Sequence, residues 1–138
     1  MRTSKKAEYA LRALAILASR DPRAPIQIHD LAETGRIPLK FLEQILLVLR
    51  RADILVSKRG LGGGYRLSRP PSAINLAEVI QLMDGPWTSL ESSPPGEGPG
   101  ARGLSETMKE LDALVHGFLE SQTIATLLER ENPVQFEI

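Results

Sequence analysis

Residues 58–65 read Lys-Arg-Gly-Leu-Gly-Gly-Gly-Tyr, and a short strand-like stretch lies on either side of the glycines. The stretches at 54–58 and 64–67 are bounded by turn-forming residues, which is typical of two paired strands. Glycines in the connection permit backbone angles that other residues avoid, and they let the backbone come close to another surface. We therefore predict a β-hairpin with a glycine-rich loop and place Arg59 at its tip.

Glycine-rich loops also occur in nucleotide-binding enzymes, but this loop has different surroundings. A phosphate-binding loop follows a strand, precedes a helix and usually carries a Lys-Ser/Thr pair downstream. Here strand-like sequence lies on both sides, and Arg66 is followed by Leu67 and Ser68. A merely flexible turn, the other alternative, does not explain why Lys58, Arg59 and Arg66 flank the glycines so closely. A basic hairpin loop instead fits contact with a polyanion.

Three helices are predicted before the hairpin. The first follows the N-cap Ser4 and runs to about Ser19, the second spans about 29–34 and ends at Gly35, and the third starts with Pro38 and stops near Asp53. The first helix has apolar residues at helical spacing, which are Ala7, Leu11, Leu14 and Ala18, with Ala10 and Leu17 widening the stripe. The third helix has Leu39, Leu42, Ile45, Leu46 and Leu49. The order of helix, helix, tight turn, helix and hairpin is that of a winged helix-turn-helix, whose third helix enters the major groove of DNA.

The second half of the chain is predicted to be helical around one long loop. Asn75, with Glu78 three residues later, indicates a capped helix at 75–84. A mobile loop rich in Ser, Pro and Gly follows, then a long helix at about 105–121 and a short one around 123–131. The predicted fold class is mainly α with a small β-hairpin. We divide the chain into a winged helix-turn-helix DNA-binding domain at 1–70, a connecting helix at 71–87, a flexible loop at 88–103, and a dimerisation helix with a C-terminal segment at 104–138.

The formal net charge of zero hides a separation of charge along the chain. Residues 1–70 carry fourteen Lys and Arg against six Asp and Glu, whereas residues 71–138 carry three against eleven. A basic half is typical of a protein that meets a polyanion, and an acidic half does other work. Unequally charged solvated faces are the alternative explanation.

The first turn of the third predicted helix carries residue types that read base edges. Its candidate DNA-binding residues are Pro38, Lys40, Phe41, Glu43 and Gln44. Lys40 can donate to guanine O6 and N7 or to a phosphate, and Gln44 can pair with adenine. Glu43 only accepts hydrogen bonds, for instance from cytosine N4, so it would select bases as much by rejection as by attraction. In the alternative interpretation, Lys40 and Glu43 are ordinary exposed charges and Phe41 belongs to the core.

Further candidates would contact the DNA backbone or the minor groove. They are Arg2, Ser4, Lys5, Lys6 and Tyr9 near the start of the chain, and Lys58, Arg59, Gly60, Gly62 and Gly63 in the hairpin. Phosphate contacts fix the register of a protein on DNA and make its affinity depend on salt. The guanidinium of Arg59 suits a narrow minor groove. Arg50 and Arg51 would either join the phosphate contacts or form the solvated end of a helix.

The long predicted helix carries a heptad-like apolar seam. Its candidate dimerisation residues are Leu104, Met108, Leu111, Val115 and Phe118. A helix that follows a long loop has little of its own chain to pack on, so we expect a second copy to cover it in a symmetric dimer. Packing against the first helix of the same chain is the alternative.

Composition argues against several other classes of protein. The chain has no cysteine, which removes disulfides, thiolate metal sites and cysteine nucleophiles. His29 and His116 are the only histidines, and neither has a nucleophile or a second metal ligand at suitable spacing. Glu91, Glu97 and Glu106 have no spacing that demands a cation. We therefore expect that the protein is not an enzyme and binds no metal or cofactor. Because the sequence shows neither a signal peptide nor a membrane helix, we also expect a cytoplasmic protein.

Four stretches resemble the Rrf2 family of bacterial transcription regulators. They are residues 3–14, residues 37–46 with Phe-Leu-Glu-Gln, residues 59–67 with Arg-Gly-Leu-Gly-Gly-Gly-Tyr, and residues 74–80. The resemblance implies a dimer with crossed long helices on a roughly palindromic operator. Lys40, Phe41, Glu43 and Gln44 then match the recognition-helix positions of the family, and Arg59 its wing arginine. Many members hold an iron–sulfur cluster on three cysteines before the long helix, which this cysteine-free chain cannot do.

These patterns together predict a sequence-specific DNA-binding transcription regulator. We expect a repressor that acts as a homodimer on double-stranded DNA, at a roughly palindromic operator, without an iron–sulfur cluster. The alternatives are a winged-helix adaptor for protein–protein contact and a regulator that needs a protein or small-molecule partner. Trp87, beside Pro86 at the root of the loop, is a candidate wall of an effector pocket, and packing in the core or at the dimer edge is its alternative role.

Overall fold

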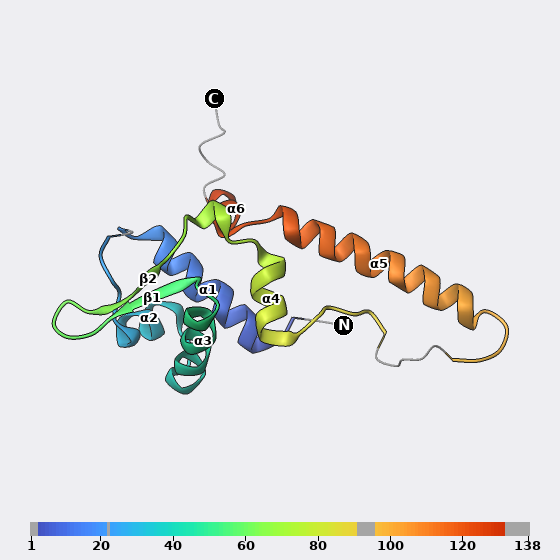
Figure 1. Cartoon of the computed structure of the whole chain (residues 1–138), viewed down its shortest axis with the longest axis horizontal. Helices are drawn as coiled ribbons and strands as arrows, with labels where there is room; N and C mark the ends of the chain where they lie inside the picture. The colour runs from blue at the N-terminus through green and yellow to red at the C-terminus, as the bar shows by residue number, and fades with distance from the viewer. Residues whose placement is uncertain (1–2, 22, 91–95, 132–138) are drawn as a thin grey trace, which may run out of the picture.

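The structure, a computed structural model, describes residues 3–21, 23–90 and 96–131 (Figure 1). Its elements are α1 (Lys5–Ser19), α2 (Ile28–Gly35), α3 (Leu39–Arg51), β1 (Leu55–Lys58), β2 (Gly64–Leu67), the 3₁₀ turn η1 (Pro71–Ala73), α4 (Leu76–Asp84), α5 (Ala101–Ser121) and α6 (Ile124–Arg130). The fold is therefore mainly helical with one antiparallel hairpin, and the predicted fold class is confirmed. Among the helices that the structure describes, none combines the length and the apolar character that crossing a membrane requires.

Helix α1 lies at the centre of the core and packs against α2, α3, α4 and α6. The N-cap Ser4 accepts a hydrogen bond from the Ala7 amide, as the sequence predicted. The buried residues of α1 are Ala7, Ala10, Ala13, Leu14 and Leu17, whereas Leu11 and Ala18 are only partly buried. The predicted apolar face, widened by Ala10 and Leu17, is therefore buried over most of its positions, and Ala13 joins it. A helix with neighbours on several sides buries more than one face, and its alanines let those neighbours come close.

The turn between α2 and α3 differs in detail from the prediction. Gly35 was expected to end α2, but it is the last helical residue, and Arg36 adopts the left-handed conformation at φ 51° and ψ 50°. Gly35 is needed for space instead, because a Cβ atom there would lie 2.9 Å from side-chain carbons of both Ile16 and Ile37. Pro38 is the N-cap of α3 rather than its first residue.

The hairpin pairs β1 with β2 as predicted, in a register that sets Leu55 opposite Leu67. A third segment, not predicted from the sequence, joins the hairpin, because Ile26 forms a two-way backbone bridge with Tyr65 at 2.9 and 2.8 Å. Gly64, the residue before Tyr65, has φ 141°, and a Cβ atom there would overlap the Ile26 carbonyl. The wing is thereby anchored to the segment before α2.

Helix α4 is capped by Asn75, whose side chain accepts from the Glu78 amide, as predicted. The Glu78 carboxylate does not reach back to complete a capping box. It accepts two hydrogen bonds from Arg69 at 2.8 and 2.9 Å, and this pairing raises the pKa of Arg69. Helix α4 is therefore tied to the chain that leaves β2.

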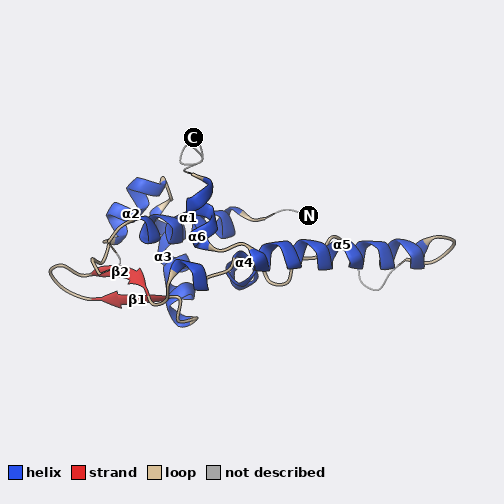
Figure 2. Ribbon diagram, turned by 90° about the horizontal axis from the view of Figure 1, so that it is seen from above, coloured by secondary structure: helices blue, strands red, loops and turns tan. Residues whose placement is uncertain are grey.

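Helix α5 begins at Ala101 rather than near Ser105, so the loop before it is shorter than predicted and Gly103 is helical. The root of that loop is fixed, since the Ser89 amide donates to Asp112 at 2.8 Å. Residues 91–95 of the predicted loop lie outside the described part of the chain. Helix α5 packs on α4 near its C-terminal end and projects from the rest of the molecule (Figures 1 and 2).

Candidate nucleic-acid interface

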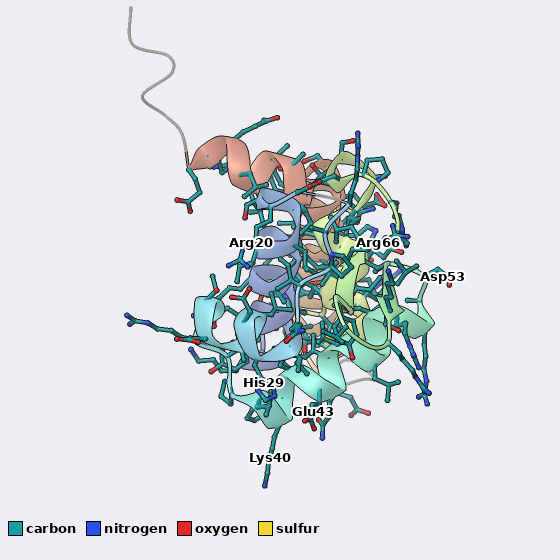
Figure 3. The ribbon with its side chains drawn as sticks, turned by 90° about the vertical axis from the view of Figure 1, so that its left-hand side faces the viewer. Arg20, His29, Lys40, Glu43, Asp53 and Arg66 are labelled. Carbon is teal, nitrogen blue, oxygen red and sulfur yellow. The ribbon has the colours of Figure 1, made fainter. Side chains whose placement is uncertain are left out.

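Helix α3 presents an exposed polar face opposite a buried one. It buries Leu42, Ile45, Leu46 and Leu49 against the core. Lys40, Glu43 and Gln44 are exposed, and Figure 3 shows Lys40 and Glu43 projecting away from the body of the protein. Phe41 is 47% exposed, so it is not a core residue. The structure thus brings the predicted recognition residues together on one accessible surface.

The N-terminal end of α1 is joined to this surface by an aromatic contact. The rings of Tyr9 and Phe41 lie 6.1 Å apart, and Tyr9 is flanked by Lys5 Nζ at 5.9 Å and by the Arg12 guanidinium at 5.4 Å. Glu8 pairs with both cations, whose hydrogen bonds, first that of Lys5 and then that of Arg12, lower the pKa of its carboxyl group. These contacts hold a cluster of cationic and aromatic groups beside the first turn of α3.

Arg12 also fixes the turn that leads into the recognition helix. Its guanidinium donates to the Gly35 carbonyl at 3.0 Å, so a side chain of α1 holds the turn between α2 and α3 in place. A second ion pair, between Arg20 and Asp30 at 2.7 Å, joins α1 to α2, and its hydrogen bond lowers the pKa of Asp30. The relative placement of α1, α2 and α3 is therefore set by polar contacts as well as by the core.

For two of the N-terminal candidates, Ser4 and Arg2, the structure gives less support for a DNA contact than for Tyr9 and Lys5. Ser4 has its hydroxyl group engaged, because it caps α1 and also donates to the Asp84 carboxylate. The Ser4 amide donates to the same carboxylate at 3.0 Å. Arg2 lies outside the described residues. A DNA contact by either residue stays a prediction.

The glycine-rich wing loop forms a defined turn. Gly60 and Gly62 have φ of 89° and 73°, and the Gly63 amide donates to the Gly60 carbonyl at 2.9 Å. A Cβ atom at Gly63 would overlap the Lys58 carbonyl, so the loop closes too tightly for any other residue there. Lys58 and Arg59 are exposed on this turn. The glycines therefore give a compact, backbone-rich tip with basic side chains on it.

One further residue lies on this face without having been predicted as part of it. His29, in the first turn of α2, is exposed and lies on the same side as Lys40 in Figure 3. The first helix of a helix-turn-helix crosses the DNA backbone, which makes its N-terminal turn a phosphate-binding position. No sequence motif marks His29, and only the placement of α2 beside α3 shows it. Arg66, by contrast, lies well away from Lys40.

The apolar seam of α5 is largely uncovered. Within the described residues α5 has no buried residue, and Leu104, Leu111, Leu114 and Phe118 are all exposed. Met108 and Val115 are partly buried. The main neighbour of α5 is α4, not α1. The alternative that α1 covers this seam is therefore not supported.

The donor set does not fit an iron–sulfur cluster. The chain of 138 residues has no cysteine to supply a thiolate. Across residues 3–21, 23–90 and 96–131, no group of three His, Asp or Glu side chains is placed to hold a metal ion. Of Glu91, Glu97 and Glu106, the first lies outside the described part of the chain. His116 pairs with Glu120 at 3.3 Å on α5.

Comparison with known proteins gives consistent matches over most of the chain. The family model described as "Rrf2: Iron-dependent Transcriptional regulator" matches residues 3–130. Rv1287 of Mycobacterium tuberculosis, a protein named as an HTH-type transcriptional regulator, is 38% identical over 128 residues, which are 91% of this chain and 80% of that protein. The HTH-type transcriptional regulator IscR of Vibrio cholerae is 32% identical over 130 residues, 93% of this chain and 75% of IscR.

Solved structures of similar proteins share the fold. CymR, the global cysteine regulator of B. subtilis, superposes with a TM-score of 0.80 at 29% identity, covering 94% of this chain and 98% of CymR. IscR of T. potens superposes with a TM-score of 0.75 at 28% identity, covering 100% of this chain and 93% of IscR. The hairpin, the three helices before it and the long α5 therefore belong to a recurrent arrangement.

Proposed function

Because the chain belongs to the Rrf2 family of transcriptional regulators, we propose that it binds a roughly palindromic DNA operator as a homodimer and represses transcription there without an iron–sulfur cluster. The observation that carries the proposal is the exposure of Lys40, Glu43 and Gln44 on α3, opposite a face that is fully buried. Such a protein works in the cytoplasm, where bacterial DNA lies.

The recognition helix reads the major groove through its first two turns. Lys40 donates to guanine O6 and N7 or to a phosphate, and Gln44 pairs with adenine. Glu43 accepts from a cytosine amino group and disfavours bases that present only acceptors. Phe41, half exposed beside them, meets a thymine methyl or a sugar, and Pro38 brings the start of the helix to the groove.

The wing contacts the neighbouring minor groove. Arg59 enters the groove, where the negative potential attracts a guanidinium. Gly60, Gly62 and Gly63 let the backbone approach, because they carry no side chain between the turn and the DNA. Lys58 contacts a phosphate. On the other flank of α3, Arg2, Ser4, Lys5 and Tyr9 form a second set of backbone contacts, which position the protein without reading sequence.

The homodimer forms through the exposed seam of α5. Phe118 is 57% exposed and Leu114 66% exposed on a helix that projects from its own domain. An apolar helix face of this kind is stabilised when a second copy covers it, and a two-fold axis between two copies of α5 sets two recognition helices on two half-sites. Occupation of the operator then blocks transcription.

Retention of genomic DNA at two salt concentrations tests this function. The purified protein, with nothing added, is incubated with fragments of its own genome, and the retained fragments are sequenced. We expect a few fragments that share a palindrome, with an affinity that falls steeply as salt rises because phosphate contacts release counterions. A Lys40→Ala/Arg59→Ala double variant should retain none of them selectively.

The alternative function, a winged-helix adaptor for protein contacts, predicts the opposite result. The protein would then retain DNA weakly, and the retained fragments would share no sequence. Equal retention by the wild type and the double variant would also contradict the proposal, because it would show that α3 and the wing do not select the DNA.

A further inference from the structure

A groove lies where α5 crosses α4, away from the recognition helix. It consists of two adjoining cavities of about 380 and about 290 Å³. Both cavities are lined by Ala77 and Gln81 of α4 and by His116 of α5. The two cavities therefore adjoin at these three residues, and each is close in size to a small-molecule site.

One end of this α4–α5 groove is apolar and aromatic. Trp87 forms part of its wall together with Ile80, which is buried, and Leu119, which is partly buried. Trp87 itself is partly buried, so its ring is held in place while part of it stays accessible. A flat apolar ligand can lie against such a wall, and the face of an indole attracts a cation.

The charged groups of the groove are mostly acidic. Asp112 and Glu120 line it one helical turn before and after His116. Asp112 is held in position by the hydrogen bond from the Ser89 amide at 2.8 Å. The third carboxylate, Glu78, is neutralised by its two hydrogen bonds with Arg69. Glu120 pairs with His116 at 3.3 Å, so the field that favours a positively charged ligand comes mainly from Asp112.

From this geometry we propose that the α4–α5 groove binds a small organic cation, a protonated amine or guanidine on a flat apolar body. The apolar body lies against Trp87 and Ile80, and the cationic group reaches Asp112. Helix α5 of a second copy is the competing occupant of this groove.

Such a ligand would act on α4, which has two polar connections to the DNA-binding half. Glu78 holds Arg69 just after the wing, and Asp84 holds the N-cap Ser4 of α1. A ligand wedged between α4 and α5 changes the position of α4 and, with it, both connections. Only this effect on operator affinity rests on the proposed function, because binding of the cation itself does not require DNA.

Trp87 is the only tryptophan of the chain, so its fluorescence reports on the groove directly. The full-length protein is titrated with phenethylammonium and benzylguanidinium, and with 3-phenylpropionate as an anionic probe of similar size. We expect a saturable change in emission with at least one cation and at least tenfold weaker binding of 3-phenylpropionate. No saturation by either cation, or equal binding of the anion, would overturn the proposal. An emission change that follows protein concentration alone would mean that a second copy fills the groove, and would overturn it too.

Variants on one helix separate this site from a general effect of charge. Asp112→Asn keeps an oxygen that accepts from Ser89 but removes the charge, and should weaken cation binding at least tenfold. Glu110→Gln changes an exposed carboxylate of α5 that does not line the groove, and should leave binding unchanged. An equal loss in both variants would contradict the site. If the cation binds but DNA is never bound, the proposed function fails while the site stands.

Discussion

The ring of Tyr9 in α1 lies 6.1 Å from the ring of Phe41 in α3, with 53° between the two ring planes. This tilted contact joins the helix that starts the chain to the first turn of the recognition helix. Because Tyr9 is partly buried and Phe41 is half exposed, the pair lies at the border between core and interface. We therefore expect the ring of Tyr9 to stabilise the packing of α1 on α3 and its hydroxyl group to contact DNA.

Replacing Tyr9 with Phe separates these two roles. The ring contact with Phe41 is kept, so the free energy of unfolding should change by less than about 0.5 kcal/mol. Loss of a hydroxyl hydrogen bond to a phosphate should weaken operator binding by about 0.5–1.5 kcal/mol. Chemical denaturation and fluorescence anisotropy with an operator fragment measure the two effects. An operator affinity of Tyr9→Phe equal to that of the wild type would remove the Tyr9 hydroxyl group from the interface.

Glu43 is expected to control sequence preference more than affinity. Its carboxylate rejects bases that offer only acceptors, so Glu43→Ala should broaden the set of tolerated operators. A mismatched base pair typically costs about 1–3 kcal/mol, and at one operator position this penalty should fall below about 1 kcal/mol in the variant. Binding to a panel of operators with single changes measures it. Glu33→Ala, at an exposed carboxylate of α2, serves as the control, and an unaltered penalty at every position would contradict the role of Glu43.

The local elements of this fold were predictable because their signals are local. Ser4 and Asn75 cap their helices as the sequence indicated, and the glycines at 60–64 form the predicted turn. The exposed positions on α3 also followed from helical spacing alone. Each of these features depends on residues within a few positions of one another, so the local sequence is sufficient to predict it.

The features that were missed depend on distant partners. Ile26 pairs with Tyr65, which lies 39 positions later in the sequence, and no pattern around Ile26 predicts a strand. Glu78 has the spacing of a capping-box residue, but Arg69 competes for its carboxylate with two charge-assisted hydrogen bonds, which are stronger than one to a backbone amide. His29 joins the candidate interface only because α2 packs beside α3.

Arg59 should contribute affinity through a groove-directed contact. Arg59→Ala is expected to weaken operator binding by about 1–3 kcal/mol and to reduce the salt dependence of binding, because a cationic contact is lost. Titrations at several salt concentrations give both quantities. Arg102→Ala, at an exposed arginine near the start of α5, should change neither. If Arg59→Ala binds as the wild type does, the wing has no part in the mechanism.

Gly64 is expected to be essential for the wing rather than for DNA contact. At φ 141°, with the Ile26 carbonyl where a Cβ atom would stand, Gly64→Ala must break the bridge between Ile26 and Tyr65. We expect a loss of about 1–3 kcal/mol in the free energy of unfolding. Gly103→Ala, in α5 where a Cβ atom meets open space, should cause no loss. Thermal unfolding compares the two, and equal stabilities would show that the wing tolerates a side chain at Gly64.

The seam of α5 offers a test of the dimer that leaves the fold intact. Leu111 is exposed and Val115 is partly buried, and neither belongs to the core cluster, so a Leu111→Asp/Val115→Asp variant should keep its helical content and its thermal unfolding transition. Two charges at the centre of an apolar helix pair should nevertheless separate the copies, which sedimentation equilibrium measures. Operator affinity should fall at least hundredfold, because each monomer loses the effective concentration that the second half-site provides. The control Lys109→Ala/Glu110→Ala alters two exposed charges on the same turn and should remain dimeric. A variant that stays dimeric with Asp at both seam positions would place the interface on another surface, whereas a monomer with undiminished operator affinity would mean that one winged helix suffices to recognise the DNA.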